Sequence, residues 1–374
     1  NHVDPHHFLF EDLPDSTWFH FWPTYTQSNF KASTLYDPYA SEYDRKKFNE
    51  GWFVEDMPDF DQDNPFLATY LIQNTIWWVE QFDLHGIRID TYTYPDQSFM
   101  KKLNKAMLDN YPDMALFGET WVHQTTTQSY FVGNSRTRGG DDNYHYSVTD
   151  FQVAFGIRNA VTEDFGWTEG VSDLYYALAK DVVYPEPEKH VTFFDNHDLE
   201  RLYGIADKNL DKLHQGIALL MTLRGTPCLL YGTELLMAGT ENHGKIREDM
   251  PGGWKGDSID KFNSENWSTE ERATIELIQN LQQCRTENQD LFNQGKMVQF
   301  IPNKGVYAYG RIHNGKTLLV ILNTGREEHS IDYGKYKELI QNKREAQNIV
   351  TQELVQLKTN DKLAASGFVV LFFD

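Results

Sequence analysis

Three acidic side chains follow short apolar runs, and their types and spacing make them the strongest candidates for chemistry in this sequence. They are Asp90, Glu119 and Asp198. In a parallel β/α barrel the carboxyl ends of the strands converge on one pocket, so acids far apart in the sequence can meet there. A single acid after a strand is more often a helix N-cap or a solvated loop residue. Taken one at a time, the three acids leave both interpretations open.

Arg88 favours the catalytic interpretation of Asp90. Side chains at positions i and i+2 of a strand point to the same face, so we expect Arg88 to lie beside Asp90. A guanidinium in contact with a carboxylate favours its charged form. We therefore expect Asp90 to stay ionised, as a nucleophile must.

Asp90 and Glu119 together match the pair of carboxyl groups that glycoside hydrolysis needs. The retaining route uses an ionised nucleophile and a protonated acid separated by about 5 to 5.5 Å. Asp198 would lie across the pocket and bind the hydroxyl groups of the sugar as it distorts. His2 and His197 would add hydrogen bonds to the same sugar.

Alternating helix and strand patterns predict the elements that position these residues. Asn64 and Pro65 predict the start of a helix of about five turns, and Asp96 predicts the start of the next. Further helices are expected at 170–182 and 211–224, and strands at 87–90, 114–117, 146–149, 190–194 and 227–231. Such repeats favour an α/β fold, a (β/α)8 TIM barrel, of which five strands are visible where eight are needed.

The regions before and after this pattern differ from it. Residues 3–62 show no sustained period and predict an inserted, loop-rich subdomain. Ser268 and Glu271 form a capping box that opens a helix to about residue 287. From residue 291, apolar strands around an Asn-Gly turn at 314–315 predict a C-terminal antiparallel β-sandwich domain.

Composition narrows the class of ligand. The chain of 374 residues has a formal net charge of −21, which would repel nucleic acid and anionic membrane surfaces, so a neutral substrate fits better. Aromatic residues make up 14% of the chain, and such rings stack on the apolar faces of sugars. Trp52, Phe53 and Trp121 are the candidates for this role, although any single ring is as readily a core residue.

Four short segments resemble, in the right order, the four conserved regions of the alpha-amylase family of glycoside hydrolases. They are residues 1–2, 86–90, 118–119 and 194–198. Residues 57–61 look like the fifth region, and residues 250–254 are similar to a segment of neopullulanases and cyclomaltodextrinases. The resemblance extends over the whole chain, including the C-terminal β domain.

The resemblance implies a role for each candidate residue. It implies Asp90 as nucleophile, Glu119 as general acid and base, and Asp198 as stabiliser of the transition state. It implies that His2, Arg88 and His197 contact the substrate.

The activity implied is that of a retaining glycosidase that forms a covalent glucosyl-Asp90 intermediate. It would cleave alpha-1,4 bonds in maltooligosaccharides, cyclomaltodextrins or pullulan, with alpha-1,6 cleavage and transglycosylation left open. The main alternative is a non-catalytic carbohydrate-binding relative on the same scaffold, but such relatives lose carboxylates that this sequence keeps. Residues 91–94, and Asp59 and Asp61 in the fifth region, depart from the common patterns and leave the fine specificity open.

The resemblance also carries expectations about metal, partners and location. Asn1 matches a position that binds calcium in many amylases, so calcium is left open while no cofactor is required. A homodimer is also left open. Related enzymes work in the bacterial periplasm or cytoplasm, of which we favour the periplasm.

The family pattern finally implies a domain division. In the family the Asn-His pair follows the third barrel strand, so we expect the first three strands on a preceding segment of the same gene product, as a separate chain. The predicted domains are 1–62, the end of the third strand and the inserted subdomain B; 63–290, the catalytic barrel from strand four to strand eight; and 291–374, the C-terminal β-sandwich domain.

Overall fold

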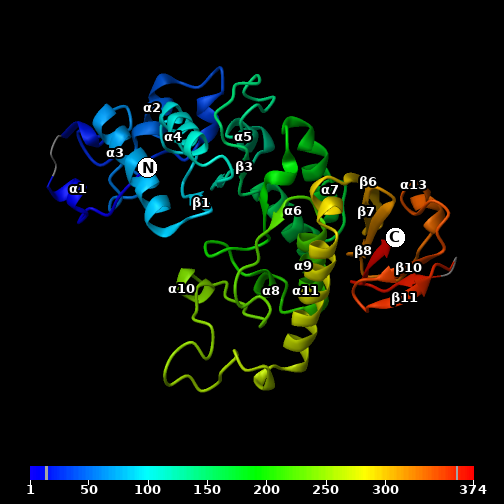
Figure 1. The fold of residues 1–374 in the computed structure, drawn as a ribbon. Helices are drawn as coiled ribbons and strands as arrows, with labels where there is room; N and C mark the ends of the chain where they lie inside the picture. The colour runs from blue at the N-terminus through cyan, green and yellow to red at the C-terminus, as the bar shows by residue number, and fades with distance from the viewer. Residues whose placement is uncertain (13–15, 359–360) are drawn as a thin grey trace. The chain divides into compact units, whose positions relative to one another are not determined.

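The computed structural model describes residues 1–12, 16–358 and 361–374, which form two compact units (Figure 1). The first unit contains Asn1–Phe151 and Val182–Val191, and the second contains Gln152–Asp181 and Thr192–Asp374. Among the helices of the described residues, none combines the length and the apolar character needed to cross a membrane.

The first unit contains a parallel sheet in the order β1-β2-β3. Its strands are β1 (Gly86–Ile89), β2 (Ala115–Gly118) and β3 (Ser147–Val148), and a parallel bridge from Thr149 to Val191 extends it. Helices α3 (Pro65–Phe82) and α4 (Gln97–Asn110) contribute apolar side chains to one core cluster with β2. The predicted alternation of helix and strand is confirmed here.

Capping side chains set the starts of both helices, as predicted. The side chain of Asn64 accepts hydrogen bonds from the backbone N–H groups of Phe66 and Leu67. That of Asp96 accepts one from Phe99. Each cap satisfies N–H groups that have no partner inside the helix.

The described residues among the first 60, 1–12 and 16–60, form short elements joined by loops. They are α1 (Phe8–Glu11), α2 (Glu42–Glu50) and 3₁₀ turns at Ser16–Trp18 and Ala32–Leu35. Antiparallel bridges join His2 to Asp59 and Phe19 to Phe60. This segment therefore returns to its own beginning, which brings Asp59 beside the start of the chain.

The second unit contains most of the remaining helices. They are α6 (Phe151–Thr162), α7 (Val171–Ala179), α8 (Leu202–Ile205), α9 (Leu210–Thr222), α10 (His243–Ile246), α11 (Thr269–Glu287) and α12 (Gln289–Asn293). The remaining short elements outside the C-terminal sheet are α5 (Thr125–Tyr130) in the first unit, β4 (Val191–Thr192), β5 (Thr226–Pro227), and 3₁₀ turns at Lys180–Val183, Pro187–Lys189 and Ser264–Asn266. Both hydrogen bonds of the predicted capping box at the start of α11 are present.

Three predicted strands are shorter than expected: those at 146–149 and 190–194 are reduced to the two residues of β3 and of β4, and the third differs most. The pattern predicted a strand over 227–231, but β5 ends at Pro227. Beyond it the chain forms tight turns, with bonds from Thr233 N–H to the Leu230 carbonyl and from Leu235 N–H to the Gly232 carbonyl. The apolar run therefore forms turns in which Cys228 and Tyr231 are exposed and Leu229 packs against the core, and its composition alone does not distinguish this from a strand.

The C-terminal part is an antiparallel sheet in the order β11-β10-β13-β8-β7-β6. Its strands are β6 (Lys296–Asn303), β7 (Val306–His313), β8 (Lys316–Asn323), β10 (Glu345–Asn348), β11 (Glu353–Gln356) and β13 (Phe368–Phe373). A second pair, β9 (His329–Ser330) and β12 (Lys362–Leu363), accompanies it with α13 (Lys337–Ile340) and a 3₁₀ turn at Tyr333–Tyr336.

Alternate residues of this sheet belong to different cores, as the period of a strand requires. Tyr307 and Val320 pack in the cluster that includes α9 and α11. Ala308 and Ile321 pack in another, with Leu339 of α13. The predicted antiparallel domain is confirmed. Its second layer consists of the short β9-β12 pair and α13, because the segment between β8 and β10 turns repeatedly.

Candidate active site

Arg88 joins the two predicted catalytic acids of the first unit. Its Nη1 donates to Oδ1 of Asp90 at 2.7 Å, and its Nη2 donates to Oε1 of Glu119 at 2.8 Å. The two acids follow the ends of β1 and β2, where Ile89 lies opposite Gly118 in a parallel register. Adjacent parallel strands therefore bring residues 29 positions apart to one guanidinium.

The two carboxyl groups have different surroundings. The side chain of Glu119 is 9% exposed, whereas that of Asp90 is 59% exposed. Pairs of carboxyl groups that perform different steps of glycoside hydrolysis occupy different environments of this kind. The asymmetry suits a proton donor at Glu119 and a charged nucleophile at Asp90.

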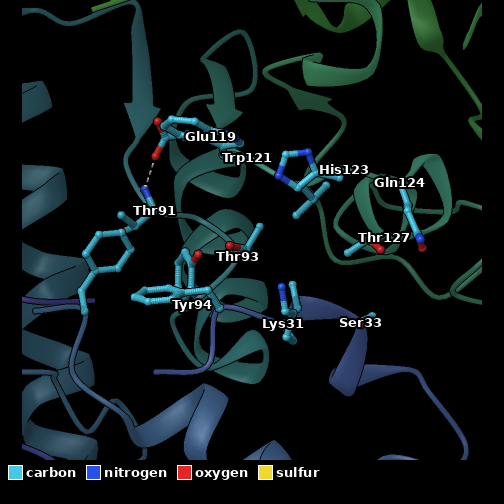
Figure 2. Close-up of a pocket in the computed structure, with 14 residues that line it drawn as sticks. Lys31, Ser33, Thr91, Thr93, Tyr94, Glu119, Trp121, His123, Gln124 and Thr127 are labelled. Atoms are coloured by element: carbon cyan, nitrogen blue, oxygen red, sulfur yellow. Dashed lines mark hydrogen bonds between the residues drawn. The ribbon is translucent and has the colours of Figure 1, made fainter. Parts of the chain in front are cut away.

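Thr91 holds Glu119 from the other side. Its backbone N–H donates to Oε2 of Glu119 at 3.0 Å (Figure 2), and its Oγ1 donates to Oδ1 of Asn1 at 2.8 Å. The backbone of Thr91 has a φ of +47°, a conformation that is strained for a β-branched residue. The two hydrogen bonds hold this strained residue next to the nucleophile.

His2 and Phe53 lie beside this arrangement. Nδ1 of His2 donates to Oδ1 of Asn1 at 2.9 Å, and its ring stacks on Phe53 with 5.9 Å between centroids. Burial lowers the pKa of His2 to about 4, against the opposing charge of Asp90. His2 is therefore neutral at pH 7 and suited to hydrogen bonding with a neutral sugar.

A pocket of about 400 Å³ opens beside Glu119. In Figure 2, Glu119 and Trp121 lie at one end, Lys31 and Ser33 at the opposite end, and His123 and Gln124 along one side. Its other lining residues are Phe30, Ala32, Phe53, Thr91, Thr93, Tyr94, Val122 and Thr127. Aromatic rings beside a few polar groups are typical of sugar-binding pockets.

Two of the three predicted stacking residues line this pocket. They are Phe53 and Trp121, and Trp121 stacks on Phe151 at 5.3 Å while 41% of it stays exposed. Trp52 does not line it. Its indole N–H donates to the backbone carbonyl of His20 at 2.7 Å, a bond that ties two loops together.

Asp198 and His197 belong to the second unit and lie together there. Nε2 of His197 lies 3.2 Å from Oδ2 of Asp198, and Arg247 donates to Oδ1 of the same carboxylate. Arg247 also donates to the backbone carbonyl of His197 at 2.8 Å. The structure thus joins Asp198 to His197 and Arg247 within the second unit, and Asp90 to Arg88 and Glu119 within the first.

Sequence reasoning missed several residues of these two clusters. Arg247 follows Asp198 by 49 positions with no motif between them. Thr91 and Lys31 carry no catalytic signature of their own. Only the position of Thr91, directly after the predicted nucleophile, could have singled it out.

The surroundings of Asn1 are fully hydrogen-bonded. Its Nδ2 donates to Oδ1 of Asp59 at 2.8 Å, and Nδ1 of His20 donates to Oδ2 of Asp59 at 2.7 Å. Burial lowers the pKa of His20, but the hydrogen bond to Asp59 and the charges of Asp59, Asp61 and Glu50 outweigh it, so the pKa is raised overall. Among the described residues, no group of three or more His, Cys, Asp or Glu could hold a metal ion.

Comparisons with known proteins agree with this geometry. The family model described as "Alpha amylase, catalytic domain" matches residues 6–290, and that described as "Cyclo-malto-dextrinase C-terminal domain" matches residues 297–372. A maltogenic alpha-amylase of Bacillus acidopullulyticus is 24% identical over 328 residues, which are 85% of this chain and 51% of the relative. A cyclomaltodextrinase of Geobacillus thermopakistaniensis is 25% identical over 197 residues, 52% of this chain and 31% of the relative.

A solved structure shows the same fold. The alpha-amylase of Geobacillus thermoleovorans matches with a TM-score of 0.77 and 20% identity, over 100% of this chain and 75% of that one. The chain thus has the TIM-barrel fold of these enzymes with a C-terminal antiparallel sheet, and it spans about half the length of the maltogenic alpha-amylase. The chain belongs to the alpha-amylase family and is related to maltogenic amylase and cyclomaltodextrinase.

Proposed function

We propose that this protein is a retaining glycosidase that cleaves alpha-1,4-glucosidic bonds in maltooligosaccharides and cyclomaltodextrins. The observation that carries the proposal is the bridge that Arg88 makes between Asp90 and Glu119 at adjacent strand ends. A single guanidinium that contacts both carboxyl groups keeps them near each other, which favours the separation of about 5 to 5.5 Å that the retaining route requires.

Two displacements complete the reaction. Oδ of Asp90 attacks the anomeric carbon while Glu119 gives its proton to the departing glycosidic oxygen, which leaves a glucosyl ester on Asp90. Glu119, now a carboxylate, takes a proton from water, which attacks the same carbon and releases Asp90. Each step inverts the anomeric carbon, so the product keeps the alpha configuration.

The remaining predicted residues serve binding in this scheme. Asp198 binds the hydroxyl groups of the distorted sugar, with Arg247 and His197 fixing its orientation. His2 and Arg88 contact the sugar beside the bond that breaks, and Phe53 and Trp121 stack on neighbouring units in the pocket. Trp52 supports the loop of His20 in the structure, so its predicted contact with sugar remains a prediction.

The names of the relatives support the class of substrate. Two of the relatives are a maltogenic alpha-amylase and a cyclomaltodextrinase, and the C-terminal match is to a cyclomaltodextrinase domain. We extend the proposal to alpha-1,6 bonds in pullulan, and to transfer onto a second sugar in place of water. The pocket beside Glu119 offers room for such an acceptor.

We also propose that a further segment of the same gene product, a separate chain, completes the barrel. Among the described residues β1 pairs only with β2, and α3 exposes the side chains of Trp77, Trp78 and Phe82. An unpaired strand edge and apolar surface favour a covering partner. Native mass spectrometry of the protein from its host should find a second polypeptide; a lone folded 43.6 kDa monomer would contradict this.

The remaining proposals follow the resemblance. The chain divides into 1–62, 63–290 and 291–374, and no cofactor is required. Its charge of −21 argues against nucleic acid and membrane partners. A homodimer and a location in the bacterial periplasm, with the cytoplasm as the alternative, stay predictions.

The test is product formation from maltoheptaose, cyclomaltodextrin and pullulan by the intact protein and by Glu119→Gln. Hydrolysis by the parent and its loss in the variant, with the fold kept, would support the proposal, and the pattern of products would define the subgroup. Binding of these sugars without cleavage by the parent would favour the non-catalytic carbohydrate-binding alternative.

A further inference from the structure

Protein groups already use the oxygen atoms that a calcium ion would need at Asn1. Oδ1 of Asn1 accepts from Oγ1 of Thr91 at 2.8 Å and from Nδ1 of His2 at 2.9 Å. Oδ1 of Asp59 accepts from Nδ2 of Asn1 at 2.8 Å. Calcium binds six to eight oxygen ligands, so an amide oxygen and a carboxylate that are both engaged by donors do not fit this ion.

His20 contacts Asp59 and Asp61 through its two ring nitrogens. Its Nδ1 donates to the remaining oxygen of Asp59 at 2.7 Å, and its Nε2 lies 3.5 Å from Oδ1 of Asp61. The side chain of Asp59 is 2% exposed and that of His20 is 19% exposed. The backbone fixes the pair as well, because His20 N–H donates to the Asp59 carbonyl at 3.0 Å.

A continuous chain of contacts leads from this pair to the catalytic groups. Asp59 holds Asn1, and Asn1 holds both His2 and the side chain of Thr91. The backbone N–H of Thr91 in turn donates to Oε2 of Glu119. Because Thr91 has a strained positive φ, its position depends on these bonds.

We propose that His20 is a positioning residue that takes the place of a metal ion: it holds Asp59 and, through Asn1 and Thr91, sets the geometry of Glu119 and His2. The inference rests on the proposed hydrolytic function, since it assigns His20 an effect on that reaction. His20 touches no reacting atom. Its loss leaves the buried carboxylate of Asp59 without this hydrogen-bond donor and lets the amide of Asn1 turn away from Thr91.

The experiment compares the intact protein with His20→Ala, His20→Gln and a matched control, His6→Ala. His6 is in the same segment, and its side chain is 86% exposed in an ion pair with Glu11. Each protein is assayed on maltoheptaose with EDTA, with calcium chloride and with imidazole. Circular dichroism and thermal unfolding show which variants are folded.

We expect the parent to have the same rate with EDTA as with calcium, and we expect the same of the His6→Ala variant. His20→Ala should lose about tenfold or more in kcat with little change in KM, because small misplacements of catalytic groups have effects of this size. Imidazole should restore part of its rate, and His20→Gln, which can still donate to Asp59, should retain more activity than His20→Ala.

Two results would overturn the proposal. One is a parent that loses activity with EDTA and regains it with calcium, which would assign the role to a metal. The other is a folded His20→Ala variant with the kcat of the parent. A parent that cleaves none of the sugars under any condition would instead count against the proposed function itself.

Discussion

The guanidinium of Arg88 contacts both candidate catalytic acids of the first unit, one through each terminal nitrogen. The planar fork of an arginine matches such a pair, whereas a lysine offers one compact charge. We predict that Arg88→Lys loses one charge-assisted hydrogen bond, worth about 1.5 to 3 kcal/mol. Its kcat/KM should therefore be about 10- to 100-fold lower than that of the parent.

Steady-state kinetics on maltoheptaose check this prediction. Arg326→Lys is the matched control, because Arg326 and Asp164 form an ion pair in which both side chains are more than three-quarters exposed. The control should keep the kcat/KM of the parent. Equal kcat/KM in Arg88→Lys and the parent would contradict the role given to the bridge.

The sequence predicted the catalytic acids but not all of the side chains that hold them in position. The spacing of Arg88 and Asp90 on one strand is a local pattern, and the structure has the contact that this pattern predicts. The bond between His20 and Asp59 joins residues 39 positions apart. No local period connects those two residues, so their partnership appears only when the first 60 residues fold back on themselves.

Among the elements, β2 delivers Glu119 to the site and approaches a buried ring closely. A Cβ added at Gly118 would lie 2.4 Å from Cγ of Tyr92, whose side chain is fully buried and stacks on His145. Only glycine allows this approach. We predict that Gly118→Ala lowers the free energy of unfolding by about 1 to 3 kcal/mol, because overpacking displaces the ring or the strand.

Urea unfolding measures the free energy of unfolding of Gly118→Ala, of the control variant Gly253→Ala and of the parent. At Gly253 the nearest atom would lie 3.3 Å from an added Cβ, so that change should have a much smaller effect on the midpoint. The kcat of Gly118→Ala should also fall, since Glu119 is the next residue. Equal unfolding midpoints for Gly118→Ala and the parent would contradict the packing argument.

The elements that the sequence predicted best begin with a local signal. Asn64, Asp96 and Ser268 all cap the helices predicted from them. The strand expected at 227–231 shows the limit, because a short apolar run can form a strand or turns, and here it forms turns that leave Cys228 and Tyr231 exposed. Tertiary packing decides whether such a run forms a strand or turns, and the local sequence pattern does not predict that packing.

For the whole molecule, a buried imidazole links stability to pH. Burial, with a smaller effect of the neighbouring His190, lowers the pKa of His145 to about 3. In the unfolded chain its pKa is near 6.5, so below that pH the unfolded state binds a proton that the folded state does not. The contribution of neutral His145 to the free energy of unfolding is fully present above about pH 6.5. It is lost as the pH falls, by up to about 1.4 kcal/mol per pH unit.

Unfolding free energies measured from pH 7 to pH 4 check this contribution. His145→Phe keeps a ring against Tyr92 and removes the titrating group. The variant should lose stability less steeply than the parent as the pH falls. Parallel curves for the two proteins would show that His145 does not titrate as its burial requires.

A covalent role of Asp90 determines the anomeric form of the first product that the protein releases. The intact protein and Asp90→Asn are incubated with maltoheptaose, and NMR follows the new reducing ends before they mutarotate. If Asp90 is the nucleophile, the alpha anomer appears first, and Asp90→Asn releases almost no product. Release of the beta anomer first, or an unchanged rate in a folded Asp90→Asn variant, would contradict it.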